Sequence, residues 1–309
     1  MSEPVLIPTL TRQRLCTRTG FCWPASWWWR RQMPLLWLLP LLLALVIFTL
    51  APLLWIVHSA VTVDGVYTLQ RFTQLLGSPF YRQAFGNSLY LAFGSSLAGL
   101  MVAGIAAAAL RRVGGRLKDG VIALTNMTSN MAGVPLAFAF IVILGTNGAV
   151  TLWLRQYLGI EGFNLYSMHG LLLIYTYFQI PLALLLLYPA FDNLNDDWQA
   201  ASALLGASRA RYWWHIALPV LAPALLGTFI LLFANAMGAY ATAYALTSGN
   251  YNLLTIRIAS LVAGDLFLEP ELAAALSVLL MLLLALIAWA NHLLLKRVNG
   301  GASRQGATP

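Results

Sequence analysis

Apolar runs of about twenty residues recur along this chain, and they constrain its fold more than any other feature. A helix of that length crosses the ~30 Å hydrocarbon core of a membrane and satisfies its backbone hydrogen bonds internally. Because 60% of the residues are hydrophobic and 9% are charged, an ordinary soluble domain is excluded. The predicted spans lie at about 34–57, 87–110, 121–144, 170–191, 222–246 and 272–295. The predicted fold class is therefore an all-α polytopic membrane protein with six transmembrane helices.

The segments between and beyond the spans are short, so the 309 residues leave no room for a second globular domain. We expect a basic arm over 1–33 and a six-helix transmembrane domain over 34–295, with a polar loop at 192–219 inside it. A Gly- and Ser-rich tail follows over 296–309. The first span is too long for the core of a signal peptide and is expected to remain uncleaved.

Lysines and arginines are distributed unevenly between the two sides of this predicted topology. Five lie in the arm, four at 111–118, two in the polar loop and three in the tail, whereas the opposite side has four. Acidic residues divide five and five. Since short loops rich in Lys and Arg stay in the cytoplasm, both termini and the polar loop are predicted to be cytoplasmic. Membrane orientation thus accounts for the high pI without a nucleic-acid partner.

The polar loop has the local signals of two short helices. Asn195 is suited to an N-cap, and the two aspartates after it place negative charge in the first turn, where the helix dipole favours it. Gly206 stands where a C′ glycine would end that helix. Ser208 is suited to cap a second helix running to Trp214, and Pro219 to the first turn of the next span.

The second half of this loop resembles the signature of binding-protein-dependent ABC importer permeases. That signature is Glu-Ala-Ala, three residues, Gly, nine residues, then Ile-x-Leu-Pro. In the same register this chain has Ala200-Ala201-Ser202, Gly206 and Ile216-Ala217-Leu218-Pro219. It departs from the pattern where Ala200 replaces the Glu and Ser202 the second Ala. The resemblance extends over about 80–295, and an ordinary interfacial helical hairpin is the alternative interpretation.

The resemblance implies a type I ABC importer permease fold in a bacterial inner membrane. In that family the loop inserts as a coupling helix into a groove on the ATPase subunit. The family also implies two ATPase subunits, a second permease subunit and an external solute-binding protein as partners. The residues expected to face the ATPase are Asp196, Asp197, Ala200, Ala201, Gly206, Arg209, Ile216, Leu218 and Pro219.

Enzymatic chemistry is not expected of this chain alone. A phosphate-binding loop requires Gly-Lys-Ser/Thr, but the only lysines, Lys118 and Lys296, each follow a leucine. No serine lies in a protease-like Gly-x-Ser-Gly turn, and the four histidines fall near span ends. The only cysteines, Cys16 and Cys22, form neither a disulfide framework nor a metal cluster. No catalytic residue, metal site or cofactor is therefore predicted.

Polar residues inside the spans are candidates for the solute path, because an unpaired polar group in hydrocarbon is costly. Asn235 and Thr242 are seven residues apart, so a single helix would place them on one face. Tyr240 lies between them, and Gln179 precedes Pro181 in the fourth span. The alternative for these residues is a helix–helix interface joined by hydrogen bonds, since small residues surround them.

The run GAYATAYALT at 238–247 and the later Gly264-Asp265 resemble the spermidine/putrescine branch of these permeases. That resemblance implies a polyamine-like organic cation, which tyrosine rings can hold by cation–π attraction. Asp265, Glu269 and Glu271 would make the outer mouth acidic. Related permeases carry phosphonates, iron or thiamine, so these solutes remain alternatives. A secondary transporter and a non-transporting scaffold are the other classes; the absence of a second copy of the polar loop argues against the transporter.

Overall fold

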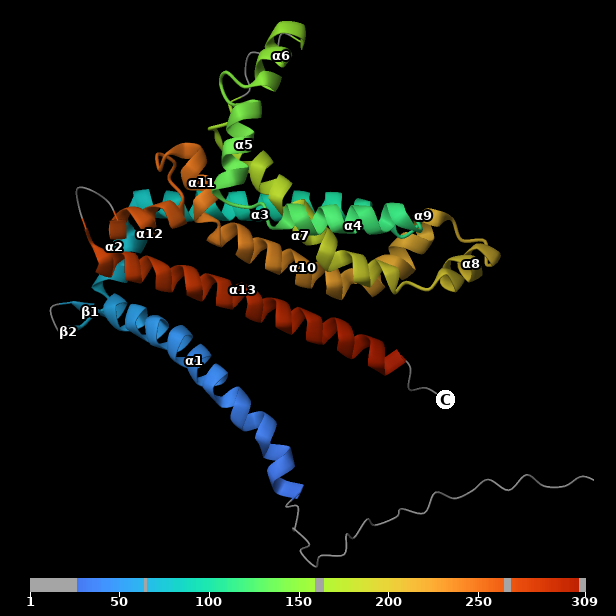
Figure 1. Ribbon diagram of the computed structural model, residues 1–309, viewed down its shortest axis with the longest axis horizontal. Coiled ribbons are helices and arrows are strands. Elements are labelled where there is room, and N and C mark those ends of the chain that lie inside the picture. The colour runs from blue at the N-terminus through green and yellow to red at the C-terminus, as the bar shows by residue number, and fades with distance from the viewer. Residues whose placement is uncertain (1–26, 64–65, 159–163, 264–267, 306–309) are drawn as a thin grey trace, which may run out of the picture. The chain divides into compact units, whose positions relative to one another are not determined.

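The computed structural model describes residues 27–63, 66–158, 164–263 and 268–305, and helices dominate it (Figure 1). It divides into a unit that ends at Leu54 and a unit that begins at Trp55, and each is described by itself. Helix α1 (Trp27–Val61) supplies the described part of the first unit. In the second unit, β1 (Thr62–Val63) and β2 (Val66–Tyr67) pair antiparallel. The other elements are α2 (Gln70–Gly77), α3 (Pro79–Leu110), α4 (Arg116–Ser129), α5 (Val134–Leu144), α6 (Ala149–Leu158), α7 (Met168–Asp192), α8 (Asp196–Leu204), α9 (Arg209–Tyr212), the π-helical turn η1 (Trp213–Ala217), α10 (Leu218–Gly238), α11 (Tyr240–Thr247), α12 (Leu254–Ala263) and α13 (Pro270–Gln305).

Six segments of the described chain are long and apolar enough to cross a membrane, which confirms the predicted number of spans. Each of them overlaps one of the predicted runs. The six segments are Leu38–Val61, Pro79–Leu110, Val134–Tyr157, Met168–Asp192, Arg209–Gly238 and Pro270–Leu293.

The third span is not the continuous helix predicted over 121–144. Helix α4 ends at Ser129 and α5 begins at Val134, and Gly133 between them has φ +87°. Only glycine adopts that backbone conformation without strain, and a proline at 135 suits the first turn of a new helix. The expected kink is therefore a complete break, after which α5 leaves the direction of α4 (Figure 1).

The fifth span is also interrupted where one helix was predicted over 222–246. Helix α10 ends at Gly238, and Ala239, with φ −76° and ψ 80°, leaves the helical conformation before α11 begins. The carbonyl oxygen of Ala239 accepts a hydrogen bond of 2.6 Å from the Tyr175 hydroxyl of α7. A side chain from another span thus stabilises a backbone group that the break leaves without a helical partner.

Both ends of the chain differ from the predicted boundaries. The arm predicted over 1–33 lies mostly outside the described residues, and α1 already begins at Trp27. At the other end α13 continues to Gln305, into the segment predicted as a tail.

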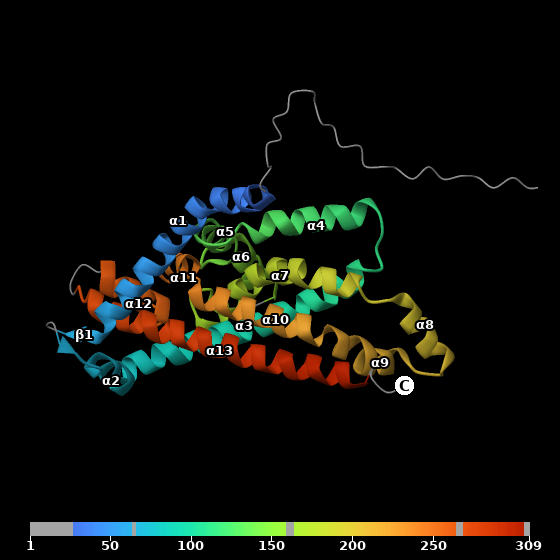
Figure 2. The same ribbon diagram turned by 90° about the horizontal axis from the view of Figure 1, so that it is seen from below.

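Helices α3, α7 and α10 pack side by side in the second unit (Figures 1 and 2). A glycine on α3 permits the closest approach, because a Cβ atom built on Gly99 would lie 2.8 Å from the Cβ of Gln179 on α7. The Gln179 side chain is fully buried at this crossing. Its Nε2 donates to Ser96 Oγ of α3 at 3.0 Å and to Leu232 O of α10 at 2.8 Å. One amide therefore links three membrane-spanning helices.

Candidate functional site

The polar loop forms a helix α8 whose two ends are closed as the sequence predicted. The Asn195 side chain accepts a hydrogen bond of 2.9 Å from Asp197 N, which is an N-cap. At the other end Gly206 has φ +78°. Ala207 N donates to Ser202 O and Gly206 N to Ala203 O, each at 3.0 Å, which is the Schellman pattern. These local caps hold α8 as a separate short helix.

The second helix of the loop begins as predicted but does not end at Trp214. Ser208 Oγ caps α9 by accepting from Arg211 N at 3.3 Å. The chain then continues through the π-helical turn η1 into α10, and Leu218 N donates to Trp213 O five residues earlier. In a regular helix the ring of Pro219 would clash with the carbonyl four residues before it, and a wider turn relieves that clash. The prediction that the second loop helix is separate from the next span is therefore wrong.

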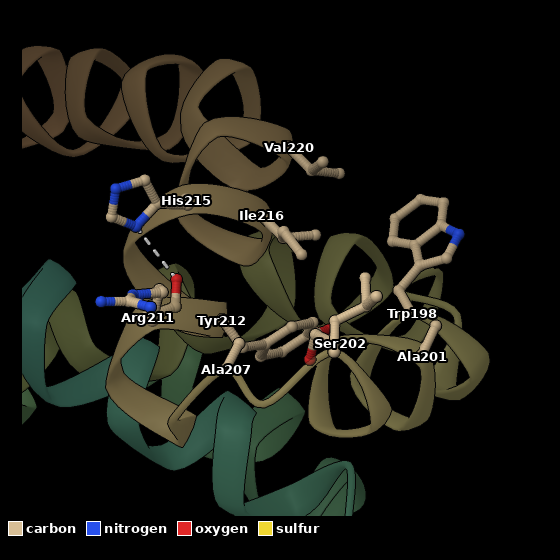
Figure 3. A pocket seen from close by; sticks show the side chains of 10 residues that line it. Trp198, Ala201, Ser202, Ala207, Arg211, Tyr212, His215, Ile216 and Val220 are labelled. Carbon is tan, nitrogen blue, oxygen red and sulfur yellow. Dashed lines mark hydrogen bonds between the residues drawn. The ribbon is translucent and has the colours of Figure 1, made fainter.

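An exposed apolar surface covers the tip of α8, at Leu204 and Leu205, and the groove beside it, whose lining side chains are drawn in Figure 3. The side chains of Leu204 and Leu205 are 90% and 88% exposed, although they stand in a loop rather than a lipid-facing span. The groove between α8 and α9–η1 has a volume of about 650 Å³. Its lining includes Trp198, Tyr212 and Ile216. Exposed apolar surface of this kind, rimmed by polar groups, is typical of a protein–protein contact site.

Most residues predicted to face an ATPase lie on the exposed surface of this loop. Ile216 is half-buried in the groove, whereas the other eight are exposed. The exposed set is Asp196, Asp197, Ala200, Ala201, Gly206, Arg209, Leu218 and Pro219. Exposure alone does not identify a partner, so their role stays a prediction at this point.

Basic residues from the corner between α3 and α4 contact the start of the loop. The Arg111 guanidinium donates to Leu194 O and forms an ion pair with the Asp196 carboxylate. Lys118 Nζ lies 3.6 Å from Asp192 Oδ1 and 5.0 Å from the centre of the Tyr188 ring. The Tyr188 hydroxyl and then the Asp192 carboxylate raise the pKa of Lys118 above its ordinary value, so this side chain stays charged.

These contacts were missed by the sequence analysis, which assigned the basic residues at 111–118 only to membrane orientation. No local pattern in the sequence joins Arg111 to Asp196, because 85 residues separate them. The apolar tip did have a signal. Leu204 and Leu205 directly precede the C′ glycine of a short helix outside the spans, where a leucine pair has no core to enter.

Two of the four predicted path residues hold helices together in the structure. Gln179 has no exposed surface and links α3, α7 and α10. Thr242 is 2% exposed, and its Oγ1 accepts a hydrogen bond of 3.1 Å from Gly133 N at the α4–α5 break. Both arrangements match the helix-interface alternative, while a part in the solute path stays a prediction for each.

The other two path residues, Asn235 and Tyr240, are on different helices. Asn235 lies exposed on α10, while Tyr240 begins α11 after the break at Ala239. The prediction that Asn235 and Thr242 share one helix face is therefore wrong. The ring of Tyr240 lies 5.3 Å from that of Tyr244, centre to centre, with the planes 34° apart. These two rings form an aromatic pair beside the break.

Of the three acidic residues predicted at the outer mouth, one is paired with an arginine. Arg71 of α2 donates to Ser59 O at 2.8 Å and Thr62 O at 2.7 Å, and it forms an ion pair with Glu271 of α13. Glu271 is therefore neutralised by a neighbour, whereas Glu269 is exposed and Asp265 lies outside the described residues. Figure 1 shows α2 and α8 at opposite ends of the long helices of this unit.

Comparison with known proteins bears on all of these features. Residues 99–300 match the family model described as the binding-protein-dependent transport system inner membrane component. The chain belongs to this family. The match contains the whole polar loop, both helix breaks and the basic corner before α4. The chain is thus a permease subunit of an ABC importer, a multi-pass protein of the inner membrane that works with an ATPase and a binding protein.

Relatives and solved structures agree with this placement. The permease is 25% identical over 243 residues to the molybdenum transport system permease protein ModB of Mycobacterium bovis, which covers 78% of this chain and 88% of that protein. It is 28% identical over 167 residues to the spermidine/putrescine transport system permease protein PotC homolog of Mycoplasma genitalium, covering 53% and 54%. A chain of a bacterial ABC transporter involved in alginate import matches with a TM-score of 0.70 and 17% identity, covering 87% of this permease and 97% of that chain. The permease therefore has the type I importer fold, and hydrolysis of ATP belongs to a partner subunit.

Proposed function

We propose that helix α8 and the adjacent groove are the docking element through which ATP hydrolysis drives this permease. The observation that carries the proposal is the exposed leucine pair, Leu204 and Leu205, at the tip of a capped helix outside the spans. Apolar anchors with polar residues around them are the usual source of affinity at an interface. A second permease subunit would supply a second such helix, so the importer would engage two ATPases.

The charge distribution supports a cytoplasmic position for α8 and for both termini. The end of the second unit that has α8 also has Arg111 and Lys118, whereas Arg71 is at the opposite end with α2. This agrees with the rule that positive loops stay inside.

The coupling of uptake to ATP hydrolysis is tested at Gly206, where the backbone conformation, and not lack of space, restricts which residue fits. A Cβ atom there would meet nothing within 4 Å, but φ is +78°. Gly206→Val is therefore expected to strain the end of α8 by roughly 1–2 kcal/mol and to lower uptake per ATP hydrolysed. Asn tolerates the left-handed conformation, so Gly206→Asn should retain coupling. Proteoliposomes containing the whole importer give both rates. Equal coupling in the Val and Asn variants would show that the turn at Gly206 does not matter for coupling.

We propose further that the transported solute is a small organic cation of the polyamine type. The relationship to a spermidine/putrescine permease homologue supports this class, as do the paired rings of Tyr240 and Tyr244 and the exposed Glu269. Molybdate is the competing candidate, because the ModB relative aligns over a larger part of the chain.

The substrate class is decided by uptake into proteoliposomes with labelled spermidine and labelled molybdate in parallel. We expect spermidine to be taken up, and Asn235→Leu to reduce that uptake without changing the melting temperature, since Asn235 is exposed on α10. Thr242→Val is the comparison. It should lower the melting temperature because Gly133 N would lose its acceptor, at a cost of about 1–3 kcal/mol. Uptake of molybdate alone would reject the polyamine assignment, and unchanged uptake by Asn235→Leu would remove that residue from the path.

A further inference from the structure

Residues 192–196, from the last residue of α7 to the first of α8, are held at both ends by basic side chains. Arg111 directly follows α3, and its guanidinium binds Leu194 O and the Asp196 carboxylate. Lys118, in the first turn of α4, faces the carboxylate of Asp192. The start of α8 is therefore tied to two helices that are distant from it in sequence.

Arg111 is the stronger of the two contacts. Its side chain is 15% exposed, whereas that of Asp196 is 89% exposed. The guanidinium binds a backbone carbonyl two residues beyond the end of α7. It also lies beside the acidic first turn of α8. An exposed ion pair contributes little by itself, but the largely buried guanidinium also satisfies a backbone carbonyl.

Membrane orientation does not explain this selective pairing. The same corner contains Arg112 and Arg116, which serve the positive-inside rule equally well. Both are exposed, and within the described ranges neither forms an ion pair. Among the four basic side chains of this corner, Arg111 and Lys118 are the two that form a hydrogen bond, ion pair or cation–π contact with residues 192–196 or Tyr188 in the described part of the chain.

One connection between α8 and the spans runs through this contact. Helix α8 is flanked by short non-helical segments, at 193–195 and at 205–208, that can act as joints. Arg111 bridges the first joint to the end of α3, which packs along α7 and α10. Helix α4 begins a few residues later and leads to the break before α5.

We propose that Arg111 is a positioning residue that passes displacement of α8 to α3 and α4, with Lys118 as a second tie. This inference rests on the proposed function of α8 as the ATPase-docking helix. The chain itself connects α8 to α10 through α9 and η1. The contact of Arg111 provides a second connection, through the α3–α4 corner. Without Arg111, α8 would still bind the ATPase but would move independently of α3.

Hydrogen–deuterium exchange tests the tie on the permease alone, in nanodiscs of phosphatidylethanolamine and phosphatidylglycerol. In Arg111→Ala, amides of α8 should exchange faster by roughly tenfold, as expected for loss of a charged hydrogen bond. Arg112→Ala is the matched control and should exchange like the wild type. Arg111→Lys should be intermediate. A lysine keeps the charge and its single nitrogen could donate to both acceptors, as Nη2 does, but its ammonium is more strongly hydrated and less fixed in position.

The transmission role is tested by uptake per ATP hydrolysed in the reconstituted importer. Arg111→Ala should bind the ATPase normally and lower this ratio several-fold, with partial rescue by Arg111→Lys and no change in Arg112→Ala. Equal ratios in Arg111→Ala and Arg112→Ala would overturn the inference. If the wild-type permease recruits no ATPase, the proposed function fails instead, and the exchange data still decide whether Arg111 holds α8. Should Arg111→Ala not insert, Arg111→Lys provides the same comparison.

Discussion

Leu204→Asp is expected to abolish recovery of the ATPase with the permease, with an affinity lower by roughly a hundredfold or more. Leu204 is 90% exposed at the tip of α8, and docking would bury it. An aspartate at the same position would lose its hydration on docking, which is costly for a charge. Leu205→Asp should have a similar effect, since Leu205 is 88% exposed. Titration of the ATPase onto permease immobilised in nanodiscs measures the affinity.

The matched control is Leu117→Asp, at the start of α4. Leu117 is 66% exposed and belongs to the basic corner on the same side of the spans, but it lies outside the polar loop. Its replacement adds the same charge and removes a similar apolar surface, and we expect unchanged affinity. Equal losses at positions 117 and 204 would indicate a general charge effect. Normal binding by Leu204→Asp would show that the ATPase docks elsewhere.

Features of this permease that depend on local sequence were predicted well. The spans were found because about twenty apolar residues are needed to cross a membrane wherever the helix packs. The caps of α8 followed from Asn195 and Gly206, whose preferred backbone conformations require no knowledge of distant residues. The family signature lies in the same loop, so the sequence indicated the surface that we propose for docking, although not its leucine tip.

Features set by distant partners were not predicted. The break at Ala239 is stabilised by the Tyr175 hydroxyl, and the break at Gly133 by Thr242. Each partner lies on another helix, so an apolar run considered by itself is predicted as one continuous helix. The same limit applies to Gln179, whose polarity suggested a solute path but whose actual neighbours are Ser96 and Leu232. A polar residue inside a span indicates that its side chain has a polar partner. Only the packing shows whether that partner is a neighbouring helix or a group in the solute path.

Gly99→Val is expected to lower the melting temperature on the order of 10 °C or to prevent folding. A Cβ at this position would lie 2.8 Å from Gln179 Cβ and 3.6 Å from its carbonyl carbon, so α3 and α7 must separate. Overpacking alone costs about 1–3 kcal/mol. Separation would also break the hydrogen bonds from Gln179 to Ser96 and Leu232, which leaves a buried amide unpaired at about 1–3 kcal/mol more.

Gly104→Val on the same helix separates this packing effect from the general effect of valine in a helix. A Cβ atom at Gly104 meets nothing within 4 Å, so the two variants share the backbone change and differ only in what the new side chain contacts. Fluorescence-detected size exclusion and thermal melting of both purified variants provide the comparison. We expect Gly104→Val to behave like the wild type. If the two variants have the same melting temperature, α3 and α7 can separate at Gly99 without loss of stability. The Gln179 amide is then not what fixes the spacing of the three central spans.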